Sequence, residues 1–210
     1  MSEINFSEQS SPDTPTSNDH RLYFESTYGM LSETDDAGTP HMIEGMEFLG
    51  STVLPSSAST TGALTIAART RLLILIFISG YGGGGGDIAS LRFNADSGNN
   101  YWDRHLTVAA GGTTLTNTEN ASTSKIRLAH SATNSGRIVT VNIMNIANKS
   151  KPITISTQTL TAAAGTIGLL DMGSGEWVNT SDQITSIEML SAGANTLSSG
   201  SGFAVYGTTF

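Results

Sequence analysis

The chain has 210 residues and no cysteine, which excludes a disulfide framework and thiolate chemistry. Only 13% of the residues are charged, a share that is unusual for a cytosolic enzyme and common in β-rich proteins with a neutral polar surface. Residues 1–60 hold ten carboxylates and one basic residue, Arg21, and this acidity disfavours nucleic-acid binding while favouring a basic or polar protein partner.

Residues 1–20 are predicted to form an extended arm. They are rich in Ser, Thr and Pro, and they contain neither the basic n-region nor the apolar h-region of a secretory signal. A segment of this composition cannot build its own core, so we expect it to be anchored on a partner. The expected contact residues are Ile4, Phe6, Pro12 and Pro15.

Residues 21–49 are predicted to form a small β meander. Three short β-prone runs, at 21–25, 30–33 and 41–44, alternate with turn sequences. The runs have too few apolar residues to be stable alone, so we expect the meander to pack on copies of itself or on the main domain. Residues 50–63 follow as a Ser/Thr-rich linker or loose strand.

Residues 64–210 are predicted to form an antiparallel β-sandwich, which makes the whole chain all-β with a jelly-roll-like main domain. Within the run 137–146, Val139, Val141 and Ile143 fall on one face. The expected strands are 64–68, 72–79, 88–94, 101–108, 125–130, 137–146, 153–159, 167–171, 183–190 and 203–206.

Residues 71–94 are the clearest core sequence. The apolar run 72–78 is too short to span a bilayer, so no membrane segment is expected. Five glycines follow at 82–86, and Asp87 comes directly after them. A phosphate-binding loop requires Gly-Lys-Ser/Thr at the start of a helix, whereas Asp87 repels phosphate and opens a strand. The glycines therefore indicate a loop at the rim of the sandwich.

Three carboxylates close in sequence, Asp87, Asp96 and Asp103, are the only candidates for a Ca²⁺ site, and no EF-hand spacing is present. The alternative is that Asp96 caps a hairpin turn through its own backbone. The histidines, His20, His41, His105 and His130, lack zinc-site spacing, and isolated solvated or hairpin-face histidines are expected. We therefore expect no metal and no cofactor.

Four aromatic residues near predicted turns, Tyr81, Tyr101, Trp102 and Trp177, are candidates for stacking on sugar rings. The alternative is that the tryptophans lie in the core or in an interface. No nucleophile elbow is present, although a Ser-His-Asp triad or a carboxylate pair assembled from distant positions stays open. We predict a chain that is not an enzyme.

Two stretches resemble virion proteins of tailed bacteriophages. Residues 12–43, with Arg21-Leu22-Tyr23, Gly29-Met30-Leu31 and Asp36-Ala37-Gly38-Thr39, are similar to a short β module of phage fibre and appendage proteins. Residues 80–104 and 202–207 resemble the C-terminal β-sandwich of many phage virion proteins. Such modules commonly associate as trimers near the attachment end, so the resemblance implies a homotrimer. The module residues expected at the contacts are Arg21, Leu22, Tyr23, Phe24 and Leu31.

The resemblance implies a structural protein on the virion surface. We expect a capsid decoration (cement) protein or head fibre that binds other virion proteins, with the major capsid protein favoured over tail proteins. The alternative is a tail-fibre or baseplate adhesin whose sandwich binds host glycans. A third hypothesis, a carbohydrate enzyme, requires a close carboxylate pair in a cleft.

Overall fold

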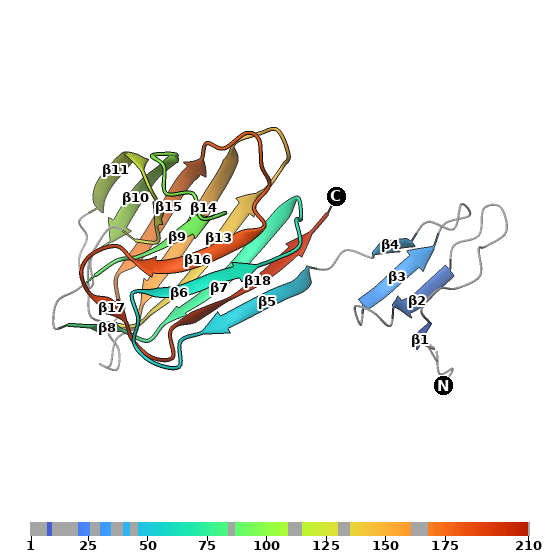
Figure 1. The fold of residues 1–210 in the computed structure, drawn as a ribbon, viewed down its shortest axis with the longest axis horizontal. Coiled ribbons are helices and arrows are strands. Elements are labelled where there is room, and N and C mark those ends of the chain that lie inside the picture. Colours follow the sequence, from blue (N-terminus) through green and yellow to red (C-terminus); the bar gives the residue numbers. More distant parts are fainter. Residues whose placement is uncertain are drawn as a thin grey trace. The chain divides into compact units, whose positions relative to one another are not determined.

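We describe the protein from a computed structural model. It describes residues 46–83, 87–108, 115–129, 135–160 and 168–209, together with the backbone of four N-terminal strands. The chain divides into two compact units, Met1–Glu47 and Phe48–Phe210. Within the described residues all regular secondary structure is strand, which confirms the all-β prediction (Figure 1).

The N-terminal unit contains a four-stranded sheet in the order β1-β2-β3-β4. Its strands are β1 (Glu8–Gln9), β2 (Arg21–Glu25), β3 (Met30–Thr34) and β4 (Pro40–Met42). β2, β3 and β4 pair antiparallel in sequence order, and β1 joins β2 in parallel. The predicted meander is therefore present, with one short additional strand from the arm.

The second unit is a sandwich of two unequal layers. The larger sheet has eight strands in the order β11-β10-β15-β14-β13-β7-β18-β5, and the smaller has four in the order β12-β9-β16-β6. A two-stranded sheet, β17-β8, lies at one end (Figure 1). The bounds are β5 (Glu47–Val53), β6 (Thr60–Thr65), β7 (Arg71–Ile78), β8 (Tyr81–Gly82), β9 (Ala89–Phe93), β10 (Tyr101–Val108), β11 (Leu115–Thr123), β12 (Ile126–Arg127), β13 (Arg137–Met144), β14 (Lys151–Thr159), β15 (Leu170–Trp177), β16 (Ser186–Ser191), β17 (Thr196–Leu197) and β18 (Gly202–Thr208).

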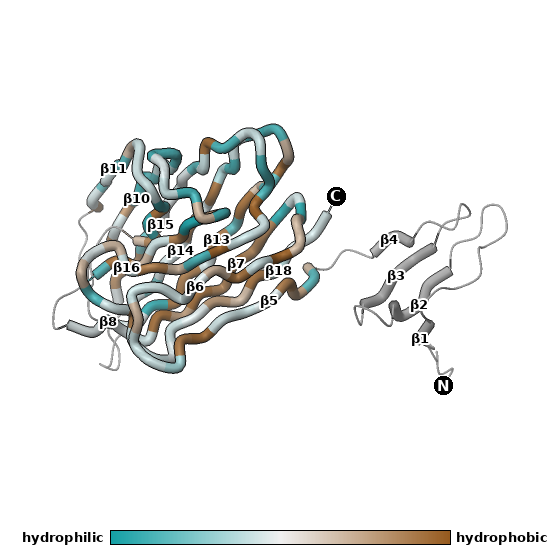
Figure 2. Tube along the Cα trace, viewed as in Figure 1, coloured by the Kyte–Doolittle hydropathy of each residue, from teal (hydrophilic) through white to brown (hydrophobic). Residues whose placement is uncertain are grey.

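The hydrophobic core lies between the two layers. Alternation along β7 and β13 places Ile74 and Val141 inside, where they are fully buried, and β9 and β16 supply Leu91 and Ile187 from the opposite layer. Val139 and Ile143 are also buried, as predicted. Figure 2 shows hydrophobic residues recurring along β7 and β16. Each buried aliphatic side chain contributes roughly 1.5–3 kcal/mol, so this layer contact stabilises the unit.

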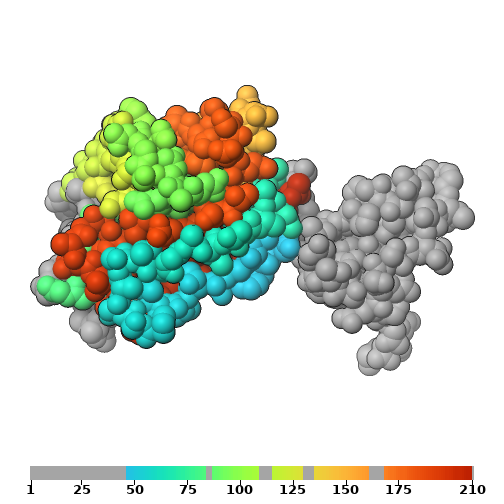
Figure 3. Space-filling view, viewed as in Figure 1, coloured from blue at the N-terminus to red at the C-terminus, as the bar shows by residue number. Residues whose placement is uncertain are grey.

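Of the two predictions for residues 50–63, a linker or a loose strand, the structure shows strand for much of the segment. These residues supply most of β5 and the start of β6, so the sandwich begins before residue 64. Both strands lie at sheet edges, and Figure 3 shows β6 beside β16 on the side of the smaller layer. Only Leu54 is buried here, while Ala58 and Leu64 pack against the core. Because an edge strand buries so few side chains, its sequence resembles that of a linker.

No helix among the described residues is both long and apolar enough to cross a membrane.

Candidate functional site

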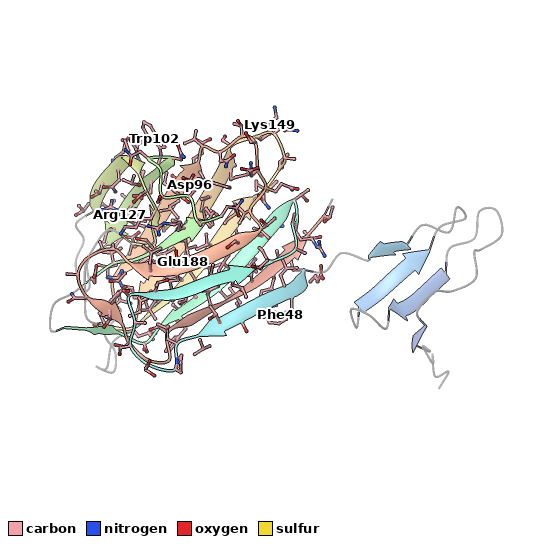
Figure 4. The ribbon with its side chains drawn as sticks, in the orientation of Figure 1. Phe48, Asp96, Trp102, Arg127, Lys149 and Glu188 are labelled. Atoms are coloured by element: carbon pink, nitrogen blue, oxygen red, sulfur yellow. The ribbon has the colours of Figure 1, made fainter. Side chains whose placement is uncertain are left out.

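An exposed tryptophan marks a shallow groove on the outer face of the larger sheet. Trp102 on β10 is 45% exposed and lies opposite Glu176 on β15 (Figure 4). The groove has a volume of about 250 Å³. We call it the Trp102 groove, and it is lined by Trp102, Asp103, Arg104, Glu119, Asn120, Ser174, Gly175 and Glu176.

The polar groups of the Trp102 groove come from the three strands β11, β10 and β15. Arg104 donates a hydrogen bond to the carboxylate of Glu119, which lies directly opposite it on β11. Asn120 Nδ2 donates to Asp103 Oδ1 at 2.7 Å, so the Asp103 carboxylate fixes the orientation of this amide. An indole face beside a carboxylate and a hydroxyl can stack on, and hydrogen-bond to, a polar ring.

The same groove contains a carboxylate pair, Glu119 and Glu176. They lie on the two strands that flank β10, Glu119 opposite Arg104 and Glu176 opposite Trp102. Two strand spacings and a two-residue offset separate their backbones by about 12 Å. The Glu119 carboxylate is also paired with Arg104. The hypothesis of a carbohydrate enzyme requires a close carboxylate pair in a cleft, and in this groove the partner that the structure gives for the Glu119 carboxylate is Arg104.

The inner face of the same strands holds a buried polar cluster. Asp103, His105 and Thr107 alternate with the exposed residues of β10 and point inward. His105 Nδ1 lies 2.6 Å from Asp171 Oδ1, and Thr107 Oγ1 donates to Asp171 Oδ2 at 2.6 Å. His105 Nε2 lies 3.5 Å from Asp103 Oδ1. His105 is thus fully buried between two carboxylates. Of the two predictions, a solvated or a hairpin-face histidine, the first is wrong for His105, which lies on a strand of the β10–β11 hairpin.

Small residues on β15 make room for this cluster. A Cβ at position 173 would lie 2.8 Å from His105 Cε1, and a Cβ at position 175 would lie 2.6 Å from the backbone oxygen of Trp102. These distances are shorter than real Cβ contacts, so both glycines are needed for close packing. The sequence signal was the alternation of Gly173, Ser174 and Gly175, which is typical of a strand approached closely on one face.

A buried cation lies near the same cluster. Arg137 on β13 is fully buried, and burial lowers the pKa of its guanidinium, while Tyr81 and Asp171 act in the opposite direction. Arg127 donates from Nη2 to Asp103 Oδ1 at 3.2 Å, so Asp103 also has a cationic partner. The inward polar groups therefore hold one another and link β10, β12 and β15.

Three of the four predicted sugar-stacking residues are buried in the core, and their prediction is wrong. Trp177 and Tyr101 are fully buried with ring centroids 6.3 Å apart, and Trp177 Nε1 donates to Asp96 Oδ2 at 2.8 Å. The Tyr81 and Tyr101 hydroxyls accept backbone hydrogen bonds from residues 89 and 93, and burial raises the pKa of each phenol. Of the four, Trp102 alone is exposed beside a groove.

The three metal candidates serve separate structural roles. Asp87 accepts from Ser191 Oγ and from the backbone N–H groups of Gly193 and Asn195. Asp96 accepts from the Gly98 N–H at 2.8 Å, the predicted turn cap. Asp103 belongs to the buried cluster described above. No group of three or more His, Cys, Asp or Glu residues suited to a metal occurs in the part of the chain that the structure describes.

The predicted anchor residues Ile4, Phe6, Pro12 and Pro15 lie outside the described residues. The module residues Arg21, Leu22, Tyr23 and Phe24 lie on β2, and Leu31 lies on β3. The structure gives the backbone pairing of these strands, such as Phe24 opposite Leu31, and their side chains lie outside its description.

Comparisons with protein families, with curated proteins and with solved structures found no match for this chain.

Proposed function

We propose that this chain is a non-enzymatic structural protein of a tailed-phage virion surface, a capsid decoration protein or head fibre. The N-terminal unit attaches it to other virion proteins, the major capsid protein first among them, and the sandwich faces outward. The resemblance of residues 12–43 and 80–104 to phage virion proteins supports this class of protein.

The observation that carries the proposal is the division into an acidic unit and a nearly neutral unit. Met1–Glu47 is a separate compact unit that contains ten of the eighteen acidic residues and one of the ten Lys and Arg residues. The sandwich unit holds the rest and is close to neutral. A small acidic unit joined to a neutral sandwich suits a protein that docks through one end and exposes the other.

The buried polar groups of the sandwich support the same proposal. The carboxylates of Asp87, Asp103 and Asp171 bond to groups within the fold, Asp171 to His105 Nδ1, and all four residues are buried. Groups used in this way hold strands and loops together. The sandwich is therefore best explained as a scaffold.

The test compares virions with and without the protein. Particles that lack the chain should release their genome at a lower temperature and after a milder osmotic shock, because a protein that binds only the assembled shell stabilises that shell. Adding back the full chain should restore the resistance, and the rebinding should weaken as salt rises because it is electrostatic. Purified virions that do not contain the chain, or resistance unchanged by its removal, would contradict the proposal.

A second candidate function is a tail-fibre or baseplate adhesin, and the exposed Trp102 beside its groove favours it. The test is a glycan array probed with the full chain and with Trp102→Ala. Binding by the full chain that is lost in Trp102→Ala supports the adhesin. Binding that survives in Trp102→Ala would show that the Trp102 groove is not the glycan site.

A further inference from the structure

The outer face of the eight-stranded sheet carries an array of exposed apolar side chains. Its strands alternate, so the residues between the buried positions of β7, β13 and β10 point away from the core. Six large apolar residues on this face are 43–60% exposed: Leu75, Phe77, Leu106, Leu115, Ile138 and Met172. Soluble monomers rarely expose so many large apolar side chains on one face.

Strand register gathers these residues into two adjacent rows at one end of the sheet. Phe77 lies opposite Ile138, and the same row continues across the sheet to Leu115 on β11. In the next row Met172 lies opposite Leu106. Gln158 and Ser156 of β14 lie between them in these rows. The apolar side chains therefore form two groups on one face, one on β7 and β13 and one on β15, β10 and β11, and we call the two groups together the apolar patch.

The other end of the same face is electrically balanced, and Trp102 and Met144 add exposed apolar side chains to it. Two bases, Arg71 and Arg104, and two acids, Glu119 and Glu176, occupy its rows. Their formal charges cancel, so a second copy of this face is not repelled. A partner with a large net charge would gain little electrostatic attraction to this neutral face.

The size of the face fits a stable dimer contact. Eight strands at about 4.8 Å spacing and side-chain rows that extend over six residue steps give a footprint of about 34 Å by 20 Å, or about 700 Å². A standard interface buries about 800 Å² on each partner, and a corrugated face has more accessible area than its footprint.

We propose that a second copy of this chain packs on the outer face of the eight-stranded sheet, with the apolar patch of each copy buried against the other. The contact is isologous, and it joins two sandwiches into a four-layered body. It is independent of the function proposed above, because it rests on the sandwich alone.

The test is sedimentation equilibrium of the full chain, whose subunit mass is 21.9 kDa. Ile138→Asp places a carboxylate inside the patch, opposite Phe77, and should weaken association at least about tenfold. Thr65→Asp is the matched control, because it introduces the same aspartate at a position that is exposed on β6 in the other layer. Circular dichroism should show that both variants unfold as the wild type does.

A measurement on the wild type keeps the test independent of variant folding. Trp102 lies on the same face, so iodide quenching of tryptophan fluorescence should increase when the chain is diluted through its association range. A chain that stays monomeric up to about 100 μM, or an oligomer that Ile138→Asp leaves as tight as Thr65→Asp does, overturns the proposal. The latter result would assign association to the N-terminal unit.

Discussion

The ring of His105 lies against Gly173 so closely that a Cβ at position 173 would lie 2.9 Å from its Nδ1. This contact sets the position of the imidazole that bonds to Asp171. The backbone of β15 thus determines where the buried cluster sits, and the Trp102 groove occupies the other face of the same strands.

Gly173→Ala should therefore destabilise the sandwich by about 1–3 kcal/mol, because the added methyl group must displace a buried ring. Ser174→Ala is the matched control, since Ser174 is the exposed neighbour on the same strand, and its effect should stay within about 0.5 kcal/mol. Urea unfolding followed by circular dichroism measures both variants. Equal stability of the two would show that the ring moves freely.

Asp171→Leu should cost about 3 kcal/mol, because it removes a buried acceptor from His105 and Thr107 and a counter-charge from the field of Arg137. Asp171→Asn should lose less, since one carbonyl oxygen remains. Ser174→Ala, at an exposed position on the same strand, is the control and should be near neutral. Thermal unfolding separates the three variants, and a leucine variant as stable as the control would contradict a cluster that supports the fold.

Asp87→Ala should release the segment that the Asp87 carboxylate holds. Ser191 Oγ and the Gly193 and Asn195 N–H groups all donate to this carboxylate. In the variant, hydrogen exchange at Gly193 and Asn195 should accelerate at least about tenfold, while Val141 in the central strand should change less. Exchange that accelerates equally at all three positions would indicate global destabilisation and would count against a local clamp.

Asp96 should make the free energy of unfolding fall as the pH is lowered through the acid range. Burial alone would raise its pKa, but hydrogen bonds from Trp177, Asn100 and the Gly98 N–H outweigh burial, so the pKa lies below its ordinary value. This stabilisation is complete above about pH 4 and is lost as pH falls through the folded-state pKa. Asp96→Asn should cost about 1 kcal/mol at pH 7 and less at pH 2.5 in urea unfolding. A cost that is the same at both values would contradict the assignment.

The strand pattern was predictable wherever a strand buries one full face. β10 begins and ends at the predicted residues 101 and 108, and β13 differs only at its end. β5 and β11 were missed because edge strands rich in Ser, Thr and Asn show no apolar alternation. Their positions depend on pairing with strands far away in sequence, which local patterns do not report.

The site was predictable only in part. Trp102 was a candidate from the sequence, but Glu119, Ser174 and Glu176 join it only because β11 and β15 flank β10. The buried pairing of His105 with Asp171 spans 66 residues, so no local motif signals it. The separation of Asp87, Asp96 and Asp103 has the same origin, since strand alternation and sheet order set their directions.

The measurement that most directly tests the account is a density map of the intact virion with this chain identified on it. A decoration protein anchored by its arm should show residues 1–20 in contact with major capsid subunits, the sandwich projecting outward, and two outer sheet faces packed together. Density for the chain at the tail tip alone would contradict the capsid assignment, and its absence from the particle would contradict the account as a whole.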